Sequence, residues 1–155
     1  TCKELEQRGA DVVGMNCFRG PPTMLPYLKE IRKQVKCHVG ALPIPLRTNK
    51  KHTTWFNLPD RDDCGCGAPH GRTFPTALEP LLCNRYEIGQ FAKDAHKIGI
   101  NYLGVCCLGN PMLVREVAHA VGLTVPASKY REKMERHFMY GENIPKHMKD
   151  YGNKA

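Results

Sequence analysis

The chain has 155 residues, of which 41% are hydrophobic and 25% are charged, values that are ordinary for a globular protein. Its apolar runs fall well short of the ~20 residues that a membrane-spanning helix needs, so no membrane partner is expected. The 23 Lys and Arg against 15 Asp and Glu give a net charge of +8, but no aromatic-interleaved groove pattern or zinc-finger spacing accompanies that charge. We therefore predict a solvated basic surface and no nucleic-acid partner.

Eight cysteines are the unusual feature of the composition. They lie beside regular strand and helix patterns, whereas the disulfide framework of a secreted protein is usually shorter and richer in loops. The adjacent residues Cys106 and Cys107 would also form a strained bridge with each other. We therefore predict reduced thiols and a cytoplasmic location.

The first half of the chain alternates between strand and helix signals. Near-continuous apolar runs predict buried strands, and apolar residues at three- and four-residue steps predict a helix. Pro43 and Pro45 fit the carboxyl end of a second strand, where ladder pairing gives way to loop. In chain order, we expect the end of a helix, a strand, a helix, a strand and a long polar loop over residues 1–9, 10–16, 23–36, 38–46 and 47–78. Because the chain opens on the end of a helix, we expect a fragment or a truncated form.

The second half continues this alternation. Asn84, with Glu87 three residues later, predicts a capped helix start, and Gly99 predicts the end of that helix. After it we expect a strand, a helix and a last helical stretch over residues 100–106, 111–121 and 130–138. The remainder of the tail contains too many glycine and proline residues to predict a packed domain. We interpret it as an extension that needs a partner surface.

Three successive strand–helix units define the fold class as α/β. Such repeats predict a parallel sheet with right-handed crossovers. Two architectures fit: an open doubly wound sheet, or part of a (βα)8 barrel, which in full needs roughly 250 residues. Glycine-rich phosphate-binding motifs are absent from the sequence, so a nucleotide-binding fold has no support.

Three cysteines occupy the ends of two predicted strands. Cys17 follows the first strand, and Cys106 and Cys107 lie at the end of the third, just before a helix start at Asn110 and Pro111. The carboxyl ends of strands are where α/β proteins place their chemistry. Three thiolates suit zinc and leave its fourth coordination position open. The residues alone leave a second interpretation, that these are small buried core residues, as is common for free cysteine.

The spacing of the cysteines sets conditions on such a site. Adjacent residues on a strand point to opposite faces, so Cys106 and Cys107 share a metal only if the backbone bends, which residues 108–110 permit. In the long loop, one glycine between Cys64 and Cys66 is too tight for the usual metal spacing, and a plain loop is favoured there even with His70 nearby. The remaining cysteines are expected to be structural: Cys2, Cys37 and Cys83.

Several segments together are similar to one known family. They read GMNC at 14–17, GALPIPLRT at 40–48, FPTALEPLLCNRYEIGQFAKDAHKIGI at 74–100, YLGVCCLGNP at 102–111 and VPAS at 125–128. The chain resembles the zinc-dependent homocysteine S-methyltransferases in these segments. An asparagine–cysteine pair on one strand, followed much later by Gly-x-Cys-Cys, is the specific part of the resemblance.

The resemblance implies a fold, a site and substrates. Residues 1–124 would be the C-terminal portion of a homocysteine-binding (βα)8 barrel, its strands six to eight, and residues 125–155 an extension used for oligomerisation or contacts. Cys17, Cys106 and Cys107 would be the zinc ligands. The activity would be transfer of a methyl group from betaine or a similar onium donor to homocysteine, giving methionine. A homo-oligomer or a larger assembly is expected, and the donor pocket lies largely outside this chain.

The sequence therefore supports two hypotheses about function. The first is that of a homocysteine methyltransferase, of which these 155 residues alone would be inactive. The second is that of a catalytically inactive truncated relative, acting as a structural or interaction component of a larger assembly. The intact set of three cysteines favours the first, and the missing barrel units favour the second. The sequence does not name the methyl donor.

Overall fold

The structure is a computed structural model that describes residues 1–59 and 73–138 together with Gly141, Glu142 and Pro145. The chain divides into two compact units, Thr1–Val125 and Pro126–Ala155. The expected roles of two such parts, barrel portion and extension, stay a prediction.

A parallel sheet forms the centre of the first unit. In the described residues it has three strands, β1 (Val12–Asn16), β2 (His38–Leu42) and β3 (Tyr102–Leu103), in that spatial order. The register pairs Val13 with Val39 and Ala41 with Leu103. The parallel α/β class predicted from the alternating pattern is therefore confirmed.

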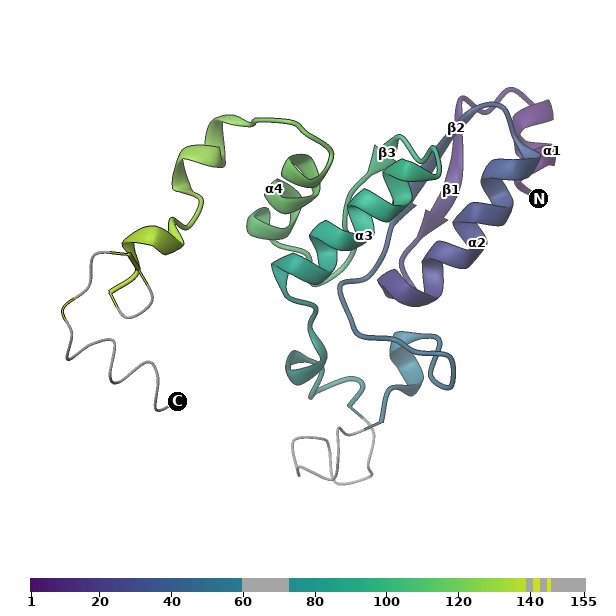
Figure 1. Ribbon diagram of the computed structural model, residues 1–155. Coiled ribbons are helices and arrows are strands. Elements are labelled where there is room, and N and C mark those ends of the chain that lie inside the picture. Colours follow the sequence, from purple (N-terminus) through teal and green to yellow (C-terminus); the bar gives the residue numbers. More distant parts are fainter. Residues whose placement is uncertain (60–72, 139–140, 143–144, 146–155) are drawn as a thin grey trace. The chain divides into compact units, whose positions relative to one another are not determined.

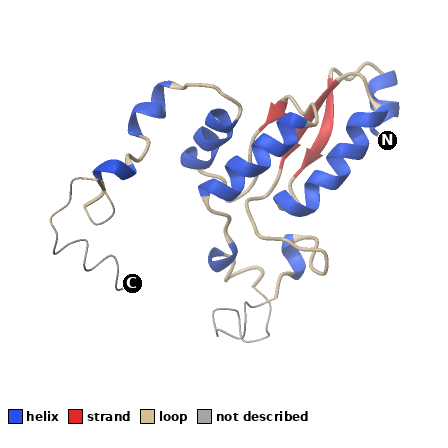
Figure 2. Ribbon diagram, viewed as in Figure 1, coloured by secondary structure: helices blue, strands red, loops and turns tan. Residues whose placement is uncertain are grey.

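Helices cover one face of this sheet (Figures 1 and 2). They are α1 (Cys2–Gln7), α2 (Pro21–Gln34), α3 (Arg85–Lys97) and α4 (Pro111–Ala120). The main core packs side chains of α2 and α3 against alternate residues of the strands. Its fully buried members include Met24 and Leu28 of α2, Ala95 of α3, and Val39 and Ala41 of β2. A second cluster joins α3 to α4 through Ile88 and Leu113, with Leu103 and Val105 packed against it. A doubly wound sheet carries helices on both faces, so the one-sided arrangement of the described residues is consistent with part of a barrel wall.

The opposite face of the sheet carries residues that alternate with the core set. Val12 and Tyr102 are 46% and 57% exposed, and both lie beside the position where Gly40 would carry a side chain. For an uncovered inner face the sequence allows two alternatives, either the set that includes Val13 and Ala41 or their neighbours in register. Val13 and Ala41 point toward the helices, and their neighbours in the period-two alternation form the uncovered face.

The strand ends differ from the sequence prediction for a physical reason. β2 stops at Leu42 rather than at residue 46, and β3 stops at Leu103 rather than at residue 106. The third strand still donates to the second, from Gly104 N–H to the Ala41 carbonyl oxygen at 3.1 Å. Pro43 has no N–H to donate in return, so the ladder ends while the two segments stay side by side.

The helix signals are largely confirmed. Asn84 and Glu87 form the reciprocal capping box at the start of α3, and the Asn110 side chain accepts from Leu113 N–H at the start of α4. α2 begins at Pro21 rather than at residue 23, because Gly20 serves as its N-cap and proline loses no needed donor in the first turn.

The second unit is described from Pro126 to Phe138 and at Gly141, Glu142 and Pro145. It holds two short 3-10 turns, Pro126–Tyr130 and Met134–Arg136, where the sequence suggested one helical stretch over 130–138. Tyr130 and Phe138 are 72% and 62% exposed, so these turns lack the apolar packing that stabilises a short helix.

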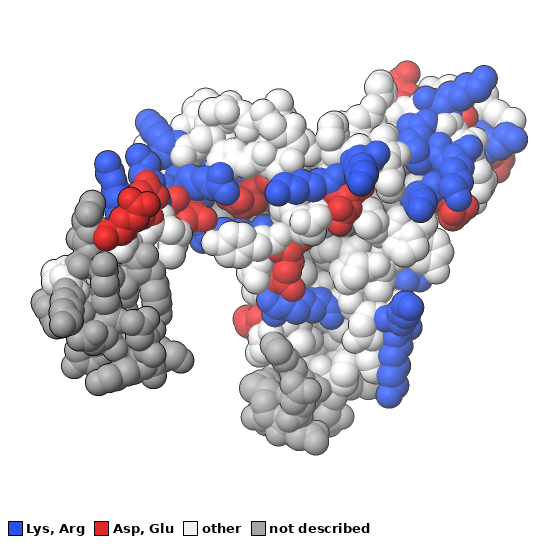
Figure 3. Space-filling view, viewed as in Figure 1, with Lys and Arg blue, Asp and Glu red and all other residues white. Residues whose placement is uncertain are grey.

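Charge is mixed on the face of the molecule that Figure 3 shows. Figure 3 shows Lys and Arg side chains spread over the face in view, with Asp and Glu side chains among them. That this surface has no nucleic-acid partner stays a prediction. Among the described residues, every helix is too short or too polar to cross a bilayer.

Candidate functional site

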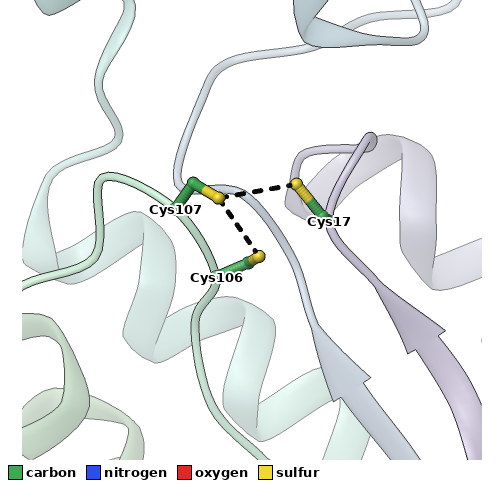
Figure 4. Close-up of side chains that lie close together, drawn as sticks. All are labelled: Cys17, Cys106 and Cys107. Carbon is green, nitrogen blue, oxygen red and sulfur yellow. Dashed lines mark hydrogen bonds between the residues drawn. The ribbon is translucent and has the colours of Figure 1, made fainter.

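The three cysteines at the strand ends lie together. The sulfur atoms of Cys17, Cys106 and Cys107 all fall within 4.8 Å of one another. Cys107 Sγ is 3.9 Å from Cys17 Sγ and 3.6 Å from Cys106 Sγ, and Figure 4 shows the three side chains converging from two segments of the chain. Cys17 and Cys106 are partly buried and Cys107 is exposed, so the cluster is open to a ligand from one side.

Cys17 is held in a tight turn between β1 and α2. Cys17 and Phe18 have φ angles of 60° and 61°, a left-handed conformation that costs a non-glycine residue about 1–2 kcal/mol. Backbone hydrogen bonds compensate for it: Cys17 N–H donates to Leu42 O at 2.9 Å, and Arg19 N–H donates to Cys17 O at 2.7 Å. Such strain persists only where the surroundings fix the chain, and is common at functional sites.

The paired cysteines sit on a second turn. Cys106 N–H donates to Pro43 O at 2.8 Å, and Gly109 N–H donates back to Cys106 O at 2.9 Å, with Leu108 at a φ of 64°. A side chain on Gly109 would come within 2.7 Å of the Cys106 carbonyl oxygen, so glycine is required there. The bend expected after Cys106 is therefore present, and it turns two adjacent sulfurs toward the same point.

The spacing of the sulfurs fits zinc. Four ligands at the zinc–sulfur distance of about 2.3 Å stand about 3.8 Å apart at the corners of a tetrahedron. Two of the three sulfur–sulfur separations, 3.6 and 3.9 Å, lie close to that value, and all three are within 4.8 Å. Three thiolates of this kind would hold a soft or borderline metal with one position left for a further ligand.

The long loop after β2 lies at the same end of the sheet as the cysteines. Thr48 Oγ1 accepts a hydrogen bond from Gly20 N–H at 3.1 Å, and Trp55 N–H donates to Phe18 O, also at 3.1 Å. In a barrel the loop that follows the carboxyl end of a strand is expected on this side, and the described residues of this loop lie there. The candidate second site at Cys64, Cys66 and His70 lies outside the described residues.

An aromatic cluster beside the cysteines was not found from the sequence. Phe18 lies 5.5 Å from Phe56, measured between ring centroids, and the Phe56 ring stacks on Trp55 at 4.1 Å. Phe74 meets both Trp55 and Phe56 edge-on. Phe18 and Phe56 are 56% and 40% exposed. The only available signal was the pair Trp55–Phe56 in an otherwise polar loop, because rings from distant segments meet only after folding.

An ion pair connects the loop after β2 to α3. Arg47 donates two hydrogen bonds to the Glu87 carboxylate, both at 2.7 Å. This bidentate pair raises the pKa of Arg47 and lowers that of Glu87. Burial raises the pKa of the neighbouring Cys83 thiol to about 12, and the negative charge of Glu87 adds to the shift. Cys83 packs beside the start of α3, which confirms its expected structural role.

We expect Cys83 to resist alkylation where the clustered cysteines react. With a thiol pKa of about 12, Cys83 holds almost no thiolate at pH 8, and it is only 7% exposed. Mass spectrometry after timed iodoacetamide treatment of metal-free protein would give the rates at single cysteines. Exposed Cys107 serves as the internal control. Labelling of Cys83 as fast as Cys107 would contradict this burial.

Comparison with known proteins places the chain in a family. The sequence profile described as homocysteine S-methyltransferase matches residues 1–121. Betaine–homocysteine S-methyltransferase 1 of Danio rerio is 31% identical over 153 residues, which make up 95% of this chain and 34% of that relative. The S-methylmethionine–homocysteine S-methyltransferase of Mus musculus is 29% identical, over 96% of this chain and 38% of its own length.

The matched lengths are unequal: the chain spans little more than a third of these relatives. The match itself nevertheless runs through both cysteine segments and all three strands of the sheet. Since the family profile covers well over half of its 155 residues, the chain belongs to the homocysteine S-methyltransferase family.

Proposed function

We propose that this chain supplies the metal-binding part of a zinc-dependent enzyme that transfers a methyl group from an onium donor to homocysteine, giving methionine. The observation that carries the proposal is the convergence of the three sulfurs of Cys17, Cys106 and Cys107 within 4.8 Å. Membership in the family supplies the reaction class. The names of the relatives include betaine and S-methylmethionine, an ammonium and a sulfonium compound, so the donor is proposed as a class.

The three cysteines would act as the metal ligands. When bound, zinc would take the homocysteine sulfur in its fourth position and favour the thiolate form at neutral pH. The residues of this chain would then hold that sulfur in place: the two turns fix the directions of the three thiolates, and exposed Cys107 marks the open side. Positioning of this kind supplies much of the rate in transfers between two bound groups.

The architecture of the whole protein is part of the proposal. The one-sided helical cover supports a barrel wall made by these strands, proposed as strands six to eight of a (βα)8 barrel. In such a barrel every βα loop lies on the catalytic face, and the proposal is supported by the position of both cysteine turns and the loop after β2 at the carboxyl ends of the strands. We further propose that residues 125–155 begin an extension used in oligomer contacts, and that the enzyme works in the cytoplasm.

The proposal predicts one zinc per chain and methionine formation in the native protein, as it is made in the cell. Metal content by atomic emission and methionine release from homocysteine with betaine or S-methylmethionine would test both points. An intact-mass measurement of the same preparation gives the length of the native chain. A native protein of 17.5 kDa, the mass of this chain, with neither zinc nor methyl transfer would instead support the inactive interaction component.

A further inference from the structure

We propose that Thr48 is a positioning residue for the sulfur cluster: its buried hydroxyl holds the turn that carries Cys17, and thereby raises the affinity of the site for zinc. The inference rests on the proposed function, because it assumes that the three cysteines bind this metal. It goes beyond that function by assigning a role to a side chain that is not one of the three proposed metal ligands.

The hydroxyl groups of Thr48 and Thr23 form a buried pair. The Thr48 side chain is 3% exposed, and its Oγ1 lies 2.6 Å from Thr23 Oγ1, which belongs to the first turn of α2. The same Oγ1 accepts from Gly20 N–H at 3.1 Å. Thr23 Oγ1 in turn lies within hydrogen-bond distance of the carbonyl oxygens of Gly20 and Thr53, at 3.3 and 3.1 Å. A loop residue thus meets the junction between the Cys17 turn and α2.

This junction is where the strained segment rejoins regular structure. Cys17 and Phe18 have left-handed φ angles, and Gly20, the N-cap of α2, returns to an extended φ of −78°. On the Cys17 side the turn is held by the bond to Leu42 O. On the α2 side the Gly20 amide has Thr48 Oγ1 as its partner. A turn in a costly conformation needs both ends fixed, and Thr48 fixes the second.

The space around Gly20 shows how close this contact is. A side-chain carbon on Gly20 would lie 1.9 Å from Leu46 O and 2.8 Å from Thr48 Oγ1. The backbone of the turn at Gly20 is therefore in close contact with the loop after β2. A change of the Thr48 side chain should alter the position of Gly20. Outer residues that orient metal ligands typically contribute 10–100-fold to metal affinity. Thr48 acts in this way through the backbone of the Cys17 turn.

The first test uses a matched set of substitutions in the native protein. Thr48→Val keeps the shape and removes the hydroxyl, and Thr48→Ser keeps the hydroxyl. Thr73→Val is the control, since Thr73 is also buried, at 2% exposure, and its hydroxyl donates to Leu58 O at 3.0 Å, outside the Cys17 turn. Zinc affinity is measured by competition with a chelator. Ligation by sulfur is followed by the thiolate charge-transfer absorption of the Co²⁺-substituted protein.

We expect Thr48→Val to bind zinc about 10–100-fold more weakly than wild type, with weakened Co²⁺–thiolate absorption, and Thr48→Ser to recover most of the affinity. Thr73→Val should lose stability while keeping wild-type zinc affinity. Equal affinity of Thr48→Val and wild type would overturn the positioning role and leave the proposed function standing. An equal loss in Thr73→Val would overturn it as well, since general destabilisation would then explain both. A wild-type protein that binds no zinc would overturn both proposals.

The second test needs no substitution, so it remains available if Thr48→Val does not fold. If the hold on Gly20 strengthens zinc binding, zinc binding must strengthen that hold by the same factor, because coupling between two equilibria is reciprocal. Hydrogen exchange of the Gly20 amide should therefore slow on zinc addition. The Ala77 amide, which donates to Thr73 O at 2.8 Å, is the reference. A zinc effect at Gly20 no larger than that at Ala77 would overturn the inference.

Discussion

Replacing Cys106 by serine in the native protein is expected to abolish zinc retention. Cys106 supplies one of three sulfurs that stand 3.6–3.9 Å from a neighbouring sulfur, and a serine hydroxyl is a hard, protonated ligand that zinc accepts poorly. Because outer-shell changes already cost 10–100-fold, loss of a direct ligand should cost more than about 100-fold. Zinc content after dialysis against a chelator measures the effect, and methyl transfer should disappear with the metal.

Cys2→Ser provides the matched control for this loss. Cys2 is a partly buried free cysteine on α1 that packs against the main core, so its loss should leave zinc content unchanged. If Cys106→Ser retained zinc through dialysis while folding normally, the three-cysteine site would be wrong. If Cys2→Ser lost zinc equally, the effect would reflect unfolding and not ligation.

Residues 1–155 produced alone are expected to hold little zinc and to make no methionine from any donor. The sheet face opposite the helices exposes Val12 and Tyr102, and β1 and β3 are its edge strands in the described residues. Open edges beside an apolar face promote association. Light scattering after size exclusion should therefore give a mass above 17.5 kDa that rises with concentration.

Val12→Lys is the matched variant for this prediction. It places a charge on the uncovered face, where Val12 is 46% exposed, and leaves the helix-facing core intact, so it should lower the apparent mass. A monomeric 1–155 chain making methionine at an ordinary enzymatic rate would overturn the expectation. A variant that associates as strongly as the unmodified chain would show that contacts elsewhere drive the association.

Much of the fold could be predicted from local signals in the sequence. Asn84 and Asn110 mark helix starts through hydrogen bonds made within three residues, and such contacts are readable from a short window of sequence. The strand limits were overestimated because apolar runs report burial, whereas ladder pairing depends on donors. Pro43 ends the pairing while the apolar pattern continues to Leu46, which is fully buried.

The candidate site likewise contains residues that the sequence predicts and residues that it does not. Cys17 and Cys106 were predictable because parallel strands bring their carboxyl ends to one edge, so the topology alone places their thiols together. Thr48 and the aromatic rings were not, since a hydroxyl in a long loop carries no periodic signal and its partner Gly20 is distant in sequence. The orientation of Val13 was left open by the sequence, because a strand with apolar residues on both faces does not say which face the helices cover.

The two cysteine turns have one support in common. Leu42 O accepts from the amide of Cys17, and the next carbonyl, Pro43 O, accepts from the amide of Cys106. A displacement of this short segment therefore carries both turns in the same direction and changes their separation little. We therefore expect the distance between the thiols to change little when the sheet moves as a whole. It should respond to changes that move one turn alone. Rigidity of the site then depends on these two consecutive carbonyl groups, together with the contacts that hold each turn separately, such as the one from the Gly20 amide to Thr48 Oγ1.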